Sequence, residues 1–200
     1  MSEASHTVAY VEPPEVEARN LWVGVRLQAG AIAFFFLGFV FAYFYLRSLN
    51  TAHMWKPKHV GASIGLGTAI AVCLLLSAAL VWNAARQLRA GRRAAWRGSG
   101  ALALALGVAA CVLQIVQWTN MGFGPADGGY ASVFIGWTGF QLVVVLMTMI
   151  WLEMLLAVGL RHRRTDGEAG LVLPGLEAFR FFWAFIAASG FAAYVVLYLA

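Results

Sequence analysis

The uncharged run over residues 31–46, AIAFFFLGFVFAYFYL, constrains this chain more than any other feature. It is dense in phenylalanine, contains a single glycine at Gly38 and is followed at once by Arg47. Together with the residues from Leu21 onward, it is long enough to cross a bilayer, which takes about 20 apolar residues. The run therefore predicts a membrane-spanning helix.

The composition extends this prediction to the whole chain. Of its 200 residues, 62% are hydrophobic and only 12% are charged, whereas a soluble domain is about half apolar and about a quarter charged. This balance predicts a polytopic, all-α integral membrane protein that forms one compact bundle. The basic residues behind the net charge of +5 lie beside hydrophobic segments. They indicate membrane topology and not a nucleic-acid partner.

Five spans are predicted from the apolar segments and the breaks between them. They follow an acidic tail at 1–20, which we do not expect to be a signal peptide, because such a peptide starts basic and turns apolar quickly. Proline and glycine clusters mark the intervening loops. The membrane domain over 21–200 thus has spans at about 21–46, 60–85, 99–119, 131–160 and 176–199.

Basic residues orient the predicted bundle. Most of the 14 lysines and arginines fall on the side that holds the tail, the second loop and the fourth loop, whereas Arg47, Lys56 and Lys58 fall on the other side. Loops facing the cytoplasm carry an excess of lysine and arginine. The expected N-terminus is therefore cytoplasmic and the expected C-terminus lies outside.

The predicted spans offer no ligands for a redox cofactor. Haem or copper at bilayer depth needs protein ligands there, usually histidine, and the chain has neither cysteines at metal-ligand spacing nor a phosphate-binding glycine loop or nucleophile elbow. We expect no catalytic residue and no metal ligand in this chain. All four histidines fall in the tail or the loops: His6, His53, His59 and His162.

Glu153 is the one acid well inside a predicted span, and an ionisable group in hydrocarbon is costly. Arg161 on the same helix, or Arg26 or Arg180 from another helix, could neutralise it in an ion pair. A role in proton transfer or in binding a lipid headgroup is the alternative, and both interpretations stay open here. Arg26 can also reach the interface through its long side chain.

Other polar and small residues predict contacts between helices. Buried amides form interhelical hydrogen bonds, whereas charges three residues apart can pair on one helix face. Glycines four residues apart allow helices to approach closely. The residues concerned are Gln114, Gln117 and Gln141 for the amides, Glu177 and Arg180 for the ion pair, and Gly61 and Gly65 for the close approach.

Four stretches, taken in order, carry a family resemblance. They are the phenylalanine-rich run at 31–47, QIVQW at 114–118, YASVF at 130–134 with TGFQ at 138–141, and GLEA at 175–178 with FWAF at 182–185. In order and spacing they resemble subunit III of the haem-copper terminal oxidases, in its short, five-span bacterial form.

The chain departs from that family's pattern at positions that are often ionisable. Glu177 matches the pattern, but neutral residues stand at most of the others, which is typical of a divergent member retained for packing and not for handling protons. The neutral residues are Ile32 and Gln117 in place of glutamate, Gln141, Val144 and Ala184 in place of histidine, and Ala187 in place of aspartate.

The resemblance implies a non-catalytic accessory subunit in a bacterial plasma membrane. Such a subunit packs on subunit I, in a complex with subunit II, supports durable turnover and oxygen access, and leaves haem and copper to its partners. It also implies a V-shaped cleft, with spans one and two set against the rest, that holds phospholipids. The residues expected at this cleft are Phe36, Gly38, Tyr43, Gly61 and Gly65.

Two other functions compete with this interpretation. The accessory protein of a nitric oxide reductase system has the same fold in the same superfamily. A small transporter is a different class, and transporters tend to show internal repeats and broken helices around a polar midplane site. The chain has no visible repeat, which counts against the transporter, but the sequence barely separates the oxidase subunit from the nitric oxide reductase accessory protein.

Overall fold

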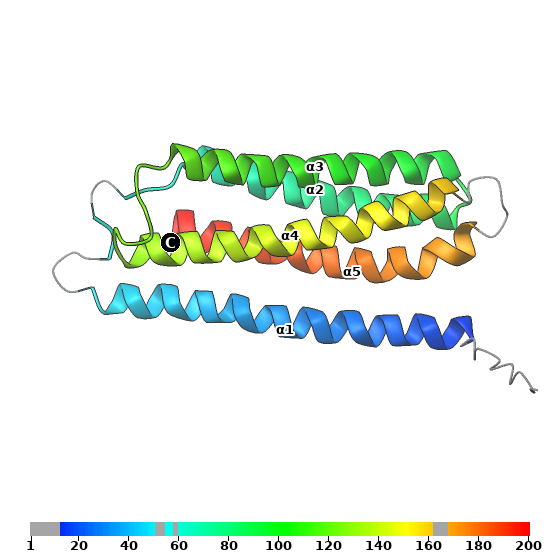
Figure 1. Cartoon of the computed structure of the whole chain (residues 1–200), viewed down its shortest axis with the longest axis horizontal. Coiled ribbons are helices and arrows are strands. Elements are labelled where there is room, and N and C mark those ends of the chain that lie inside the picture. Colours follow the sequence, from blue (N-terminus) through cyan, green and yellow to red (C-terminus); the bar gives the residue numbers. More distant parts are fainter. Residues whose placement is uncertain (1–12, 51–54, 58–59, 162–167) are drawn as a thin grey trace, which may run out of the picture.

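The computed structural model describes residues 13–50, 55–57, 60–161 and 168–200. Each of its five long helices is long and apolar enough to cross a membrane, and the described residues contain no strand. The predicted all-α membrane fold is therefore confirmed. The elements are α1 (Pro14–Ser48), α2 (Ile64–Arg89), α3 (Arg93–Asn120), α4 (Gly129–Arg161) and α5 (Glu168–Tyr194), which continues into the short η1 (Val195–Leu199) (Figure 1).

The helices divide into a group of four and a single helix. Helices α2, α3, α4 and α5 pack on one another, whereas α1 lies mainly along α4 and α5 (Figure 1). The implied grouping of spans one and two is therefore wrong, because α2 belongs to the larger group. The reason lies in α1, where Ala29, Phe36 and Tyr43 are buried at a spacing of seven residues. Such a narrow stripe covers one line of contact along a helix pair.

Local sequence explains where several helices begin and end. Helix α1 begins at Pro14, because proline suits the first helical turn, so residues 14–20 of the predicted tail are helical. The hydroxyl of Ser63 caps α2 by accepting from the Leu66 N–H (3.5 Å). Between α2 and α3, Gly91 has a φ of 70°, a conformation that glycine adopts without strain.

Close helix approach uses other glycines than those predicted. A Cβ added at Gly38 or Gly61 would meet nothing within 4 Å, and one at Gly65 would meet only Ser63. In contrast, a Cβ at Gly67 would come 2.6 Å from the Tyr198 ring. The prediction for Gly61 and Gly65 is wrong because Gly61 precedes α2 and Gly65 is exposed.

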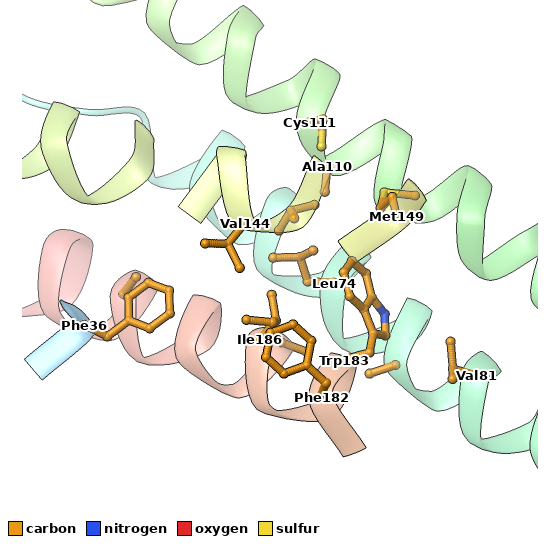
Figure 2. Packing of buried hydrophobic residues seen from close by; sticks show 14 of the residues in the cluster. Phe36, Leu74, Val81, Ala110, Cys111, Val144, Met149, Phe182, Trp183 and Ile186 are labelled. Atoms are coloured by element: carbon orange, nitrogen blue, oxygen red, sulfur yellow. The ribbon is translucent and has the colours of Figure 1, made fainter. Parts of the chain in front are cut away.

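Large aromatic side chains fill the interior of the four-helix group. Trp183 and Phe182 of α5 are each 1% exposed. Figure 2 shows side chains of α2, α4 and α5 meeting in this interior, among them Leu74, Val144 and Ile186. Lipid is as apolar as these side chains, so close packing and interhelical hydrogen bonds hold such a bundle together.

Candidate functional site

Gln117 is the centre of a buried amide network at one end of the bundle. Its side chain is 1% exposed, and its Nε2 donates to the backbone carbonyl of Ser63 (3.1 Å). Its Oε1 accepts from the hydroxyl of Tyr198 (2.7 Å) and from Nε2 of Gln114 (3.4 Å). Gln117 therefore joins α3 to the start of α2 and to η1, whereas the bond of Gln114 stays within α3.

Gln141 makes the corresponding connection between α4 and α5. Its Nε2 donates to the carbonyl of Ile186 (3.2 Å), and its Oε1 accepts from the hydroxyl of Ser189 (3.5 Å). One turn earlier on α4, Thr138 accepts from the indole N–H of Trp118 on α3 (3.0 Å). Through these hydrogen bonds, neutral side chains link α3 to α4 and α4 to α5.

Two small cavities lie among these amides. Their volumes are about 20 and 30 Å³, and both are lined by Gln114, Thr138 and Gln141. A cavity of this size, with polar walls, holds about one water molecule, whereas a small-molecule site takes several hundred Å³. The four-helix interior is thus a packed core and not a substrate site.

An ion cluster ties α2 to α5 at the arginine-rich end of the bundle. The Glu177 carboxylate lies 2.7 Å from the Arg180 guanidinium and 2.7 Å from that of Arg89. Glu177 is 8% exposed, and a buried charge needs such partners. The Arg180 guanidinium also lies 4.2 Å from the centre of the Trp82 ring. The spacing of Glu177 and Arg180 predicted their pairing, but nothing in the sequence pointed to Arg89 or Trp82.

Glu153 and Arg26 are both exposed on this chain, so its own helices bury neither of them, and the interpretation of Arg26 as reaching the interface stays a prediction. Glu153 lies on the outer face of α4 beside the exposed Met154, and no ion pair reaches it within the described chain. Arg26 lies over the Trp22 ring at 5.3 Å. The hydrophobicity of a span gives its depth in the membrane but not which of its faces turns inward.

Helices α1 and α4 leave a groove between them along the outside of the bundle. Its volume is about 350 Å³ and its walls are mainly apolar. The hydroxyl of Thr148 in its wall donates to the Val144 carbonyl (2.7 Å) and so adds little polarity. The lining residues are Gln28 and Ile32 of α1, Val143, Val144, Met147, Thr148 and Trp151 of α4, and Phe182 of α5.

The residues predicted to form a lipid cleft do not line this groove. Phe36 is buried against Phe140 and Phe185 (ring centres 5.3 and 6.4 Å apart). Tyr43 is buried against Trp55 (5.0 Å). Ile32 and Val144, two of the residues expected to depart from the family pattern, lie in the groove wall.

Within the described ranges no group of three or more His, Cys, Asp or Glu side chains could hold a metal ion. All four histidines lie outside those ranges.

The whole bundle matches one protein family. Residues 9–200 match the family profile described as "Cytochrome c oxidase subunit III". This chain belongs to the cytochrome c oxidase subunit III family. Among its relatives, cytochrome c oxidase subunit 3 of Danio rerio is 30% identical over 189 residues, which are 90% of this chain and 69% of that protein. The subunit 3 of Ornithorhynchus anatinus is 25% identical over 191 residues, 92% of this chain and 71% of that protein.

Membership of the subunit III family confirms the resemblance read from the sequence, and with five apolar helices it makes the chain a multi-pass membrane protein. Of the residues expected to depart from the family pattern, Gln117, Gln141 and Ala187 are buried, whereas Ile32 and Ala184 are half-buried. Gln117 and Gln141 bond across helices, and Ala187 is 2% exposed in the core. In this chain, side chains that cannot ionise therefore form these contacts between helices.

Proposed function

We propose that this chain is the non-catalytic, accessory subunit III of a respiratory haem-copper oxidase in a bacterial plasma membrane. The match to the subunit III family over residues 9–200 carries the proposal. Subunit I is the direct partner, subunit II belongs to the same complex, and these partners hold the haem and copper. The buried amides support a packing role, because neutral side chains already bonded across helices transfer no protons in the pH range where cells live.

The arginine-rich end of the bundle is proposed to face the cytoplasm. It holds the start of α1, the turn between α2 and α3 and the end of α4 (Figure 1). The exposed arginines of this end include Arg86, Arg92 and Arg161, and basic residues favour the cytoplasmic side of a membrane. The end of η1 then faces the outside.

A phospholipid is the proposed occupant of the groove between α1 and α4. The groove has a volume of about 350 Å³, mainly apolar walls, and opens along the outer surface of the bundle. An acyl chain fits this chemistry, and lipid held there would fill the space beside the single helix α1.

The proposed complex predicts a specific co-purification. A tagged chain, purified from native membranes in mild detergent, should elute with oxidase subunits I and II in stoichiometric amounts, and the eluate should show a haem spectrum. Mass spectrometry identifies the partners. A nitric oxide reductase in the eluate would assign the chain to that system, and a colourless, solitary protein would overturn the proposal.

Filling the groove should displace its lipid. Met147→Trp adds bulk at a groove residue that is 64% exposed, whereas Met154→Trp adds the same bulk on the same helix at a residue that is 60% exposed and outside the groove. Native mass spectrometry of the purified complex should find fewer retained phospholipids with Met147→Trp only. Equal lipid retention by both variants and the unmodified chain would remove the groove from the proposal.

A further inference from the structure

We propose that the outer face of α4 docks a transmembrane helix of another subunit, and that this helix presents a lysine or arginine to Glu153. Exposed side chains on this face recur four and three residues apart along the helix. They are Leu146, Ile150, Glu153, Ala157 and Leu160, and we call this set the α4 seam. Such spacing keeps a row of side chains on one line of contact between two helices, so the α4 seam has the pattern of a packing surface.

Glu153 is the one charged member of the α4 seam, and nothing in the described chain neutralises it. Its side chain is exposed, and no ion pair reaches it among the described residues. Arg161, at the end of α4, lies eight residues away, which is about 12 Å along a helix, and a glutamate side chain is too short to reach it. Ionisable residues in membrane spans are normally paired and face protein or water. This exception points to a partner outside the chain.

The depth of Glu153 places that partner beside the packed part of the bundle and not in a loop. Trp151, two residues earlier on α4, packs edge-on against Phe179 of α5, with ring centres 5.4 Å apart. Two residues after Glu153, the Leu155 side chain lies 2.8 Å from where a Cβ added at Gly175 of α5 would stand. Helix α4 is therefore packed on both sides of Glu153. A group that meets the carboxylate at this level belongs to another spanning helix or to a lipid.

A cation on another protein balances this carboxylate best. Lysine and arginine form charge-assisted hydrogen bonds with carboxylates, and one polar residue in an otherwise apolar seam fixes the register of two helices. A second copy of this chain does not fit, because copies in one membrane share an orientation. A twofold contact along the α4 seam would then place two Glu153 carboxylates opposite each other, and like charges at close range repel.

Photo-crosslinking in native membranes can identify the occupant. The inference rests on the proposed function, because the partner is sought among the subunits that co-purify with this chain. A benzoylphenylalanine introduced at Ile150, about one turn from Glu153, should crosslink to a transmembrane peptide of another subunit that carries lysine or arginine close to the crosslinked residue. The same probe at Val112, which is 52% exposed on α3, is the matched control and should not capture this peptide.

The outcomes separate this inference from the proposed function. Crosslinks from Ile150 to lipid alone, or to a second copy of this chain, would overturn the inference even where oxidase subunits co-purify. A crosslink to a basic spanning helix of a different complex would uphold the α4 seam and overturn the proposed function.

Glu153→Gln tests the charge itself. The variant keeps the shape of the side chain and loses its charge, so the purified complex should release this chain at least about tenfold faster in detergent, as followed by native mass spectrometry over time. Glu17→Gln removes an equal charge from an exposed residue of α1 and should leave the release rate unchanged. An unchanged rate with Glu153→Gln would overturn the proposal.

A double-mutant cycle then joins the two partners. Replacing the crosslinked lysine or arginine by glutamine should speed release by itself, and should add little when Glu153→Gln is already present, because the pair is already broken. Fully additive effects of the two changes would show that the two groups do not meet and would overturn the proposal.

Discussion

Glu177→Gln is expected to destabilise the folded chain by about 3–5 kcal/mol, the loss typical of breaking a buried ion pair on one side. The carboxylate lies 2.7 Å from both Arg180 and Arg89. The Arg180 side chain is only 17% exposed, so without Glu177 its charge stays in poorly solvated surroundings. The Arg89 side chain is 53% exposed and can turn to water.

Thermal unfolding in detergent can measure this loss through cysteine reactivity. Cys111 is buried, so a thiol-reactive dye labels it when the bundle opens. Arg89→Gln is the graded control and should have an effect of about 1 kcal/mol or less, because it removes the exposed member of the cluster. If Glu177→Gln unfolds at the temperature of the unmodified chain, the ion cluster does not hold α2 to α5.

The ion cluster shows how far sequence reasoning reaches. Glu177 and Arg180 lie one helical turn apart, so their pairing depends on local spacing that can be read directly. Arg89 and Trp82 reach them only because α2 packs on α5, and that depends on the register of two helices distant in sequence. Local rules carry no information on such a register.

The same limit explains which parts of the membrane domain were predicted. The five helices follow from apolar length, since lipid leaves the backbone no hydrogen-bond partners outside the helix. Apolar length does not determine which face of each helix turns toward the other helices. Gly65 was expected at a helix contact and is exposed, whereas Gly67, two residues later, lies against Tyr198. Glu153 was expected inside and lies outside for the same reason.

The position of α1 also depends on which of its faces packs on helices that are distant in sequence. Spans one and two were expected to form one side of a cleft against the other spans, but only one narrow stripe of α1 is buried, and it faces α4 and α5. Phe34 and Phe41 on other faces of α1 are 79% and 68% exposed. In a membrane such faces need no protein partner, so hydrophobicity alone could not indicate which face packs.

Trp183→Ala is expected to destabilise the bundle by about 3–5 kcal/mol, the range for truncating a large buried aromatic residue. The side chain is 1% exposed and stacks on Phe179, with ring centres 5.8 Å apart. Its indole N–H donates to the Ser77 hydroxyl (3.0 Å), which itself donates to the Ala103 carbonyl (2.7 Å). One residue of α5 therefore supports contacts with both α2 and α3.

Trp183→Phe separates the ring from its hydrogen bond. Phenylalanine keeps most of the apolar volume and loses the donor, so the expected loss is about 1 kcal/mol. Phe191→Ala on the same helix, at a residue that is 46% exposed, should change stability by no more than about 0.5 kcal/mol. The cysteine-reactivity assay measures all three variants. Equal losses for Trp183→Ala and Trp183→Phe would mean that the hydrogen bond through Ser77, and not the packing of the ring, holds the three helices together.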